Sequence, residues 1–95
     1  MKSILTNDNK HCFLCGRTGP LEIHHIFGGP NRNNSTEFGL VVPLCHSCHT
    51  GSVESVHQSK QAMEYLRKIG QQKFEITYPD KDFLKIFRRN YLWSL

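Results

Sequence analysis

Residues 40–49, LVVPLCHSCH, join an apolar run to a Cys-x-x-Cys pair and a trailing histidine. Leu40–Leu44 is rich in β-forming residues and predicts a strand, with Pro43 marking an edge or a strand end. The spacing of Cys45 and Cys48 lets two thiolates from one turn reach a single metal ion. The stretch therefore predicts a strand that runs directly into one half of a metal site.

The other half of this site lies upstream, in Cys12-Phe-Leu-Cys15. Two such pairs in a small chain favour a tetrahedral four-cysteine zinc site. Two disulfides or two redox dithiols are the alternatives. A third alternative has His46 or His49 replacing one cysteine as a zinc ligand.

The choice among these alternatives depends on the cellular compartment. No apolar run approaches the ~20 residues that span a membrane, and residues 1–10 hold too short an apolar segment for a signal peptide. We therefore expect a cytoplasmic protein with no membrane partner, where disulfides are rare. A chain of 95 residues also has a thin core, which a structural Zn²⁺ would reinforce.

Two strands connected by a long loop are predicted upstream of the second cysteine pair. Leu21–His24 alternates like a strand, and His24 and His25 at its end would point to opposite faces. Phe27–Thr36 is rich in Gly, Pro and Asn and predicts a loop before the strand at residues 40–44. The result is a hairpin with one imidazole on each face of the first strand.

Helical patterns follow the second cysteine pair. Residues 55–73 predict a helix with an apolar stripe and a weakened end at Gly70; the stripe consists of Ala62, Leu66, Ile69 and Lys73. A second helix is predicted after Tyr78-Pro79-Asp80, with Asp80 or Asp82 as its cap. Its aromatic stripe predicts core packing rather than base stacking; the stripe consists of Phe83, Ile86, Phe87 and Tyr91. We expect a loose lead-in over residues 1–10 and a single domain over residues 11–95.

In chain order, the segments CFLC, HHI and LCHSCH resemble the zinc-containing HNH endonucleases over about residues 11–58. More narrowly, HHIFGGPNRNNS, GLVVPLCHSCH and YPDKDFLKIFRRNYL resemble small phage HNH proteins, which we associate with the recombination-enhancement, RecA-dependent nuclease family. The resemblance implies a small α+β fold. Its centre would be a ββα-metal hairpin plus helix, stapled by the four-cysteine zinc site and followed by an additional C-terminal helix.

The resemblance also implies roles for the histidines. His24 matches the first ligand of a catalytic divalent ion such as Mg²⁺ or Mn²⁺, and His49 matches the ligand on the helix. His25 matches the general base, a role that suits an imidazole near neutral pH. Such a site would hydrolyse DNA phosphodiester bonds with a single metal ion, leaving 5′-phosphate and 3′-hydroxyl ends.

Two positions depart from the family pattern. A further helix ligand often follows four residues after the one at His49, but Val53 stands there and cannot coordinate; His57 could serve only if residues 50–55, TGSVES, fold back. The central Asn of the pattern falls on Leu40 or Gly39. A substitute brace for the general base could come from the loop, where the candidates are Asn31, Asn33 and Asn34.

Charge and composition leave two functions open. The formal net charge is +4 and would fall to about +2 with four thiolates on one Zn²⁺, which permits nucleic-acid binding without requiring it. The candidate phosphate contacts, each of which could equally be a solvated surface residue, are Arg17, Arg32, Arg88 and Arg89. One hypothesis is a phage or bacterial DNA endonuclease acting with a recombinase filament. The other is a non-catalytic zinc module that binds nucleic acid or protein, although it gives no reason for His24-His25.

Overall fold

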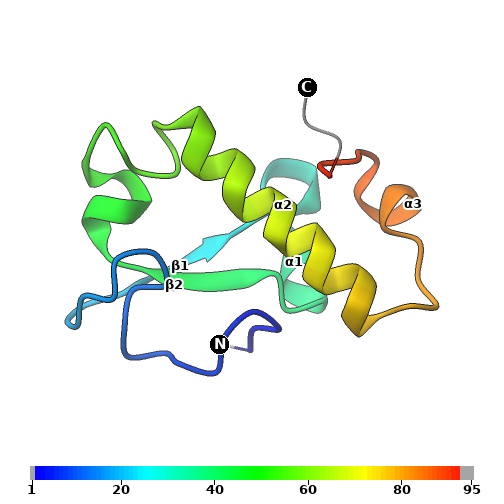
Figure 1. The fold of residues 1–95 in the computed structure, drawn as a ribbon, viewed down its shortest axis with the longest axis horizontal. Helices are drawn as coiled ribbons and strands as arrows, with labels where there is room; N and C mark the ends of the chain where they lie inside the picture. The colour runs from blue at the N-terminus through cyan, green and yellow to red at the C-terminus, as the bar shows by residue number, and fades with distance from the viewer. Residues whose placement is uncertain (1, 93–95) are drawn as a thin grey trace.

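The computed structural model describes residues 2–92 of the chain, in which a two-stranded sheet packs against helices (Figure 1). Its elements, in chain order, are β1 (Glu22–His25), the 3-10 turn η1 (Gly29–Asn31), α1 (Arg32–Glu37), β2 (Val41–Leu44), the helical turn η2 (Ser47–Gly51), α2 (Lys60–Thr77) and α3 (Phe83–Phe87). The predicted small α+β class is thereby confirmed. Within the described residues no helix is both long enough and apolar enough to cross a bilayer.

The sheet is an antiparallel pair of β1 and β2. Its register places His24 opposite Val42, and His25 opposite Val41. Both predicted strands are confirmed to within one residue at their starts. Pro43 is tolerated because a strand in a two-stranded sheet has one unpaired edge.

The connection between the strands is more ordered than predicted. The segment predicted as a loop, Phe27–Thr36, contains η1 and most of α1. Pro30 lies in the first turn of η1, where its missing N–H costs nothing. The side-chain amides of Asn31 and Asn34 donate to the carbonyl oxygens of Phe87 and Ile86, 3.0 and 3.3 Å away. Long-range hydrogen bonds to α3 thus stabilise a helical conformation in a segment whose composition predicts a loop.

The first predicted helix is shifted along the chain. It begins at Lys60 instead of Ser55, because the side chain of Ser59 caps it by accepting from the backbone N–H of Ala62. It also passes through Gly70 and ends at Thr77. A Cβ at Gly70 would lie 3.3 Å from the Ile26 side chain, so glycine allows α2 to pack closely on the end of β1. Lys73, predicted on the apolar stripe, is exposed.

Aromatic side chains of α3 and the residues after it build the core, as the sequence predicts. Phe83 and Phe87 stack with ring centroids 4.4 Å apart, and Phe27 packs against both. Asp82 caps α3 by accepting from the backbone N–H of Lys85. Phe74 of α2 also packs against Phe83 and Phe87, and this cluster therefore joins α2 to α3. Figure 1 shows α3 at the opposite end of the molecule from η2.

Residues 2–10 have no helix or strand, yet part of this segment is attached to the core. The Ile4 N–H donates to the carbonyl of Gly39 at 2.9 Å, and the side chains of Ile4 and Leu5 pack against the buried cluster.

Candidate metal centres

The four cysteines come together at the end of the sheet where β2 runs into η2. All four Sγ atoms lie within 4.8 Å of one another, and none is in a disulfide. Cys12 and Cys45 are buried, whereas Cys15 is exposed and lies with its Sγ 3.7 Å from that of Cys45. These sulfurs could hold one metal ion, and soft thiolates in a group of four suit structural Zn²⁺.

Ionisation of these thiols is uneven. Burial opposes ionisation of Cys12, but backbone N–H groups of Leu14, Cys15 and Cys45 outweigh it and lower its pKa to about 6. Burial and the neighbouring sulfurs raise the pKa of Cys48. A second thiolate is unfavourable beside the first because the two negative charges repel each other. A cation bound between the sulfurs offsets this repulsion. The donor set therefore fits a divalent metal better than four free thiols.

Three histidines form a second cluster on one side of β1. Ring centroids lie 5.3 Å apart for His24 and His49, 5.1 Å for His24 and His57, and 4.8 Å for His49 and His57. One ring nitrogen from each lies within 4.8 Å of the other two. The structure therefore brings together both sequence-predicted ligands and the conditional third one.

His57 reaches the cluster because residues 52–59 fold back on η2 instead of continuing a helix. The Val56 N–H donates to the Cys48 carbonyl at 2.8 Å, and the His57 N–H donates to the His49 carbonyl at 3.3 Å. Val56 is buried and anchors this turn, whereas the Val53 side chain is 82% exposed. His49 thus lies on η2, a short helical turn that precedes α2.

His24 gives the strongest sign that the histidine cluster fits a cation. The residue is 2% exposed, and its Nε2 atom is buried without a hydrogen-bond partner among the described residues. Burial, together with the charges of His49 and His57, lowers its pKa to about 3, so the ring is neutral at physiological pH. A buried neutral imidazole nitrogen without a partner is unfavourable unless it donates its lone pair to a ligand.

Glu22 joins the cluster, although the sequence analysis did not select it. Its Oε1 accepts from Nδ1 of His49 at 2.8 Å, and its Oε2 accepts from Nδ1 of His46 at 3.2 Å. Hydrogen bonds from His49 and then His46 lower the pKa of the Glu22 carboxyl. Strand alternation was the available signal, because positions 22 and 24 share one face of β1.

His25 lies on the other face of β1, beside α1. Its Nε2 is 3.1 Å from Oγ1 of Thr36. Burial and then the charge of Arg32 lower its pKa, which favours the neutral ring. Lys2, Arg32 and Thr36 border a hollow of ≈ 370 Å³ next to this ring. The hydrogen-bond partner of His25 is therefore Thr36, and no hydrogen bond joins this ring to the loop asparagines within residues 2–92.

The four predicted arginines lie in different places. Arg32 borders the hollow beside His25, and Arg17 borders another beside the cysteines. Arg88 ends α3, and the Arg89 guanidinium lies 5.3 Å from the Tyr91 ring. Sequence reasoning missed Arg67 of α2. Its guanidinium also lies 5.3 Å from the centre of the Tyr91 ring, and its charge contributes to lowering the pKa of His24.

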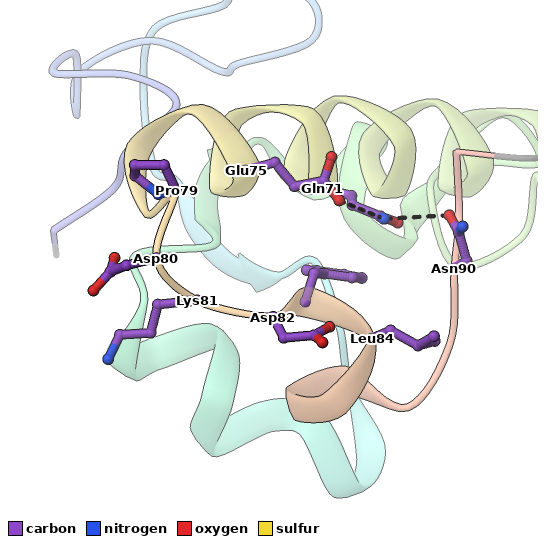
Figure 2. A pocket seen from close by; sticks show the side chains of 9 residues that line it. Gln71, Glu75, Pro79, Asp80, Lys81, Asp82, Leu84 and Asn90 are labelled. Carbon is purple, nitrogen blue, oxygen red and sulfur yellow. Dashed lines mark hydrogen bonds between the residues drawn. The ribbon is translucent and has the colours of Figure 1, made fainter.

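A further hollow of ≈ 450 Å³ lies between α2 and α3 (Figure 2). Gln71 crosses it by donating to Glu75 and to Asn90, 3.1 and 3.2 Å away. It also accepts from the Tyr91 N–H at 2.7 Å. The bonds of Gln71 to Asn90 and Tyr91 fasten the segment after α3 to α2.

Comparison with protein-family models, curated proteins and solved structures finds no match for this chain. The class of protein therefore has to be described from the structure itself. The chain is a small α+β protein with a four-cysteine group that could hold zinc. The histidine group of His24, His49 and His57 stands beside it as a second candidate site.

Proposed function

We propose that the protein is a metal-dependent DNA endonuclease of the HNH type, with Zn²⁺ on the cysteines and one catalytic divalent ion on the histidines. The observation that carries the proposal is the histidine cluster, in which the buried Nε2 of His24 has no partner among residues 2–92. A structural zinc module needs only the cysteines. It has no use for three converging imidazoles, or for a fourth on the opposite face of the same strand.

The order of the elements supports this proposal. β1 and β2 form the hairpin, and η2 follows the second cysteine pair at the position where an HNH site takes its helix ligand. The ligand-bearing helix is shortened here to a single turn. His57, which the turn at residues 52–59 returns to His49, would replace the ligand that Val53 cannot provide.

The hydrogen bonds of Thr36 assign His25 a tautomer suited to a general base. The Thr36 hydroxyl has one proton, which it donates to the Arg32 carbonyl at 3.3 Å. Its oxygen must then accept from Nε2–H of His25. The remaining nitrogen, Nδ1, keeps its lone pair and makes no hydrogen bond within the described residues. In this proposal His25 Nδ1 takes the proton of the attacking water.

Thr36 thereby takes the place of the missing Asn of the HNH pattern. Asn31 and Asn34 act one step further away, because their bonds to α3 hold α1 and with it Thr36. When bound, the divalent ion would supply charge stabilisation at the phosphate and at the departing 3′-oxygen. Arg32 beside His25 and Arg67 beside His24 would contact the neighbouring phosphates of DNA. In a cell we expect a recombinase filament to direct this weakly sequence-selective cleavage within the cytoplasm.

Plasmid nicking tests the proposal. Zinc-loaded wild type with Mg²⁺ or Mn²⁺ should convert supercoiled plasmid to the nicked form, and His25→Ala should lose at least about 100-fold of this rate, as expected for a general base. His11→Ala is the matched control, because His11 is an exposed histidine paired with Asp8. It should nick like wild type.

Zinc content and circular dichroism are measured on all three proteins. Equal nicking by wild type and His25→Ala, with zinc and fold retained, would reject the endonuclease. Absence of nicking by every protein, together with DNA binding that requires only the cysteines, would favour the non-catalytic zinc module.

A further inference from the structure

The carboxylate of Glu22 is the only acidic group among the described residues that hydrogen-bonds to the histidine cluster. It reaches His49 from β1 because Glu22 pairs with Leu44, the last residue of β2, and η2 begins shortly afterwards, at Ser47. The two strands therefore place this side chain beside the first turn of η2.

The bond between Glu22 and His49 fixes which nitrogen of His49 is available. An ionised carboxylate only accepts hydrogen bonds, so Nδ1 of His49 must carry a hydrogen. A neutral imidazole has one such hydrogen, and Nε2 is then left with a lone pair. A ring that rotated freely would present this lone pair only part of the time.

The second oxygen of the same carboxylate holds His46. The exposed His46 ring lies against Gly51, where a Cβ would be 2.6 Å from its Cδ2 atom. His46 follows Cys45 directly, and His49 follows Cys48. Glu22 is thus hydrogen-bonded to two residues that each follow a cysteine of the four-cysteine cluster. One of them, His49, is also a member of the histidine cluster, so Glu22 lies between the two candidate metal sites.

We propose that Glu22 is a positioning residue that holds His49 in the Nδ1–H tautomer and so strengthens binding of a divalent ion by His24, His49 and His57. The proposal rests on the histidine site of the proposed function but not on DNA cleavage. Outer carboxylates of this kind orient metal-binding imidazoles and make them better donors, and their loss typically weakens metal binding about 10- to 100-fold.

Cobalt titration of the zinc-loaded protein tests the proposal. Co²⁺ bound by imidazoles absorbs visible light, so its Kd is measured directly and without a nuclease assay. Glu22→Ala should weaken Co²⁺ binding about 10- to 100-fold. Glu22→Gln should weaken it less, because the amide oxygen still accepts from Nδ1–H. Glu37→Gln is the matched control, because it removes the same single negative charge at an exposed position at the end of α1. It should leave the Kd unchanged.

A second readout separates positioning from a merely structural role. Long-range ¹⁵N–¹H correlation spectra of the Co²⁺-free, zinc-loaded protein report the tautomer of each imidazole. His49 should be Nδ1–H in wild type and a mixture of tautomers in Glu22→Ala, with zinc content and backbone spectra retained. Should Glu22→Ala not fold, Glu22→Leu provides both measurements, because its side chain is of similar size and cannot accept a hydrogen bond from His49.

Three outcomes decide the question. A weakened Kd together with a changed His49 tautomer supports the positioning role. A Kd within threefold of wild type in both Glu22 variants, while His49→Ala abolishes Co²⁺ binding, overturns it and leaves the histidine site intact. Co²⁺ binding that survives His49→Ala overturns the site itself, and the proposed function with it.

Discussion

Substitution of Cys15 by serine separates a metal ligand from an ordinary surface thiol. Cys15 is exposed, and its Sγ lies 3.7 Å from that of Cys45, within the group of four sulfurs. An exposed side chain without a special role changes the free energy of unfolding by less than about 0.5 kcal/mol when replaced by one of similar size. A large effect at this position therefore has to come from the bound metal.

The magnitude follows from what structural zinc contributes. Apparent binding free energies of such sites are about 10–16 kcal/mol, which four ligands divide into roughly 3 kcal/mol each. A domain of this size is stable by only about 5–15 kcal/mol in total. We therefore expect Cys15→Ser to lower the free energy of unfolding of the zinc-loaded protein by about 3 kcal/mol.

Urea denaturation followed by circular dichroism measures this loss, with and without a zinc chelator. Thr50→Ser serves as the control, because Thr50 is an exposed residue of η2 with no role in the cluster. Once zinc is removed, Cys15→Ser and wild type should be equally stable, since the lost interaction is with the metal. A change below 0.5 kcal/mol with zinc present, or a difference that persists after chelation, would refute a zinc site at these cysteines.

Three further changes test the fold and the buried histidine. Ser59→Ala removes the cap of α2 and should cost about 1 kcal/mol in urea denaturation. Phe74→Ala should cost about 3–5 kcal/mol, whereas Ile76→Ala, at a position 73% exposed, should cost little; equal losses would contradict the packing. Burial lowers the pKa of His24 to about 3 from its ordinary 6.5, so the unfolded chain binds more protons between these values and wild-type stability falls as pH drops through them. His24→Leu does not titrate, so in metal-free protein its stability relative to wild type should rise from pH 6.5 towards pH 4; a constant difference would count against a buried neutral ring.

The hairpin and the cysteine cluster could be predicted because their signals are local. Alternation over a few residues identifies each strand, and a two-residue gap brings two cysteine sulfurs to one turn. The aromatic stripe after Tyr78 was similarly clear, because helical spacing placed Phe83 and Phe87 on one face. Each strand, each cysteine pair and the stripe depends on residues close together in the sequence. The joining of the two cysteine pairs, which lie 30 residues apart from Cys15 to Cys45, was predicted from the preference of Zn²⁺ for four ligands.

The errors lie where distant contacts outweigh local preference. Asn31 and Asn34 lie in a segment whose composition is typical of a loop. Their side-chain amides, however, donate to backbone carbonyls of α3, which is far away along the chain. Gly70 lowers the local helix propensity, but α2 continues through it to Thr77; the reason for a glycine at this position is distant, since a Cβ would lie 3.3 Å from the Ile26 side chain. Neither partner can be inferred from the residues on either side.

The start of α2 at Lys60, later than predicted, determines how the three histidines come together. In a continuous helix, the eight steps from His49 to His57 would separate the two residues by about 12 Å along the axis. Their ring centroids are instead 4.8 Å apart, because the chain leaves η2, turns at residues 52–59 and begins α2 only after the Ser59 cap. The three-histidine cluster therefore exists because the helix is interrupted. A sequence pattern that assumes a helix ligand four residues after His49 would pass over this site, since the interruption moves the third imidazole from that position to His57.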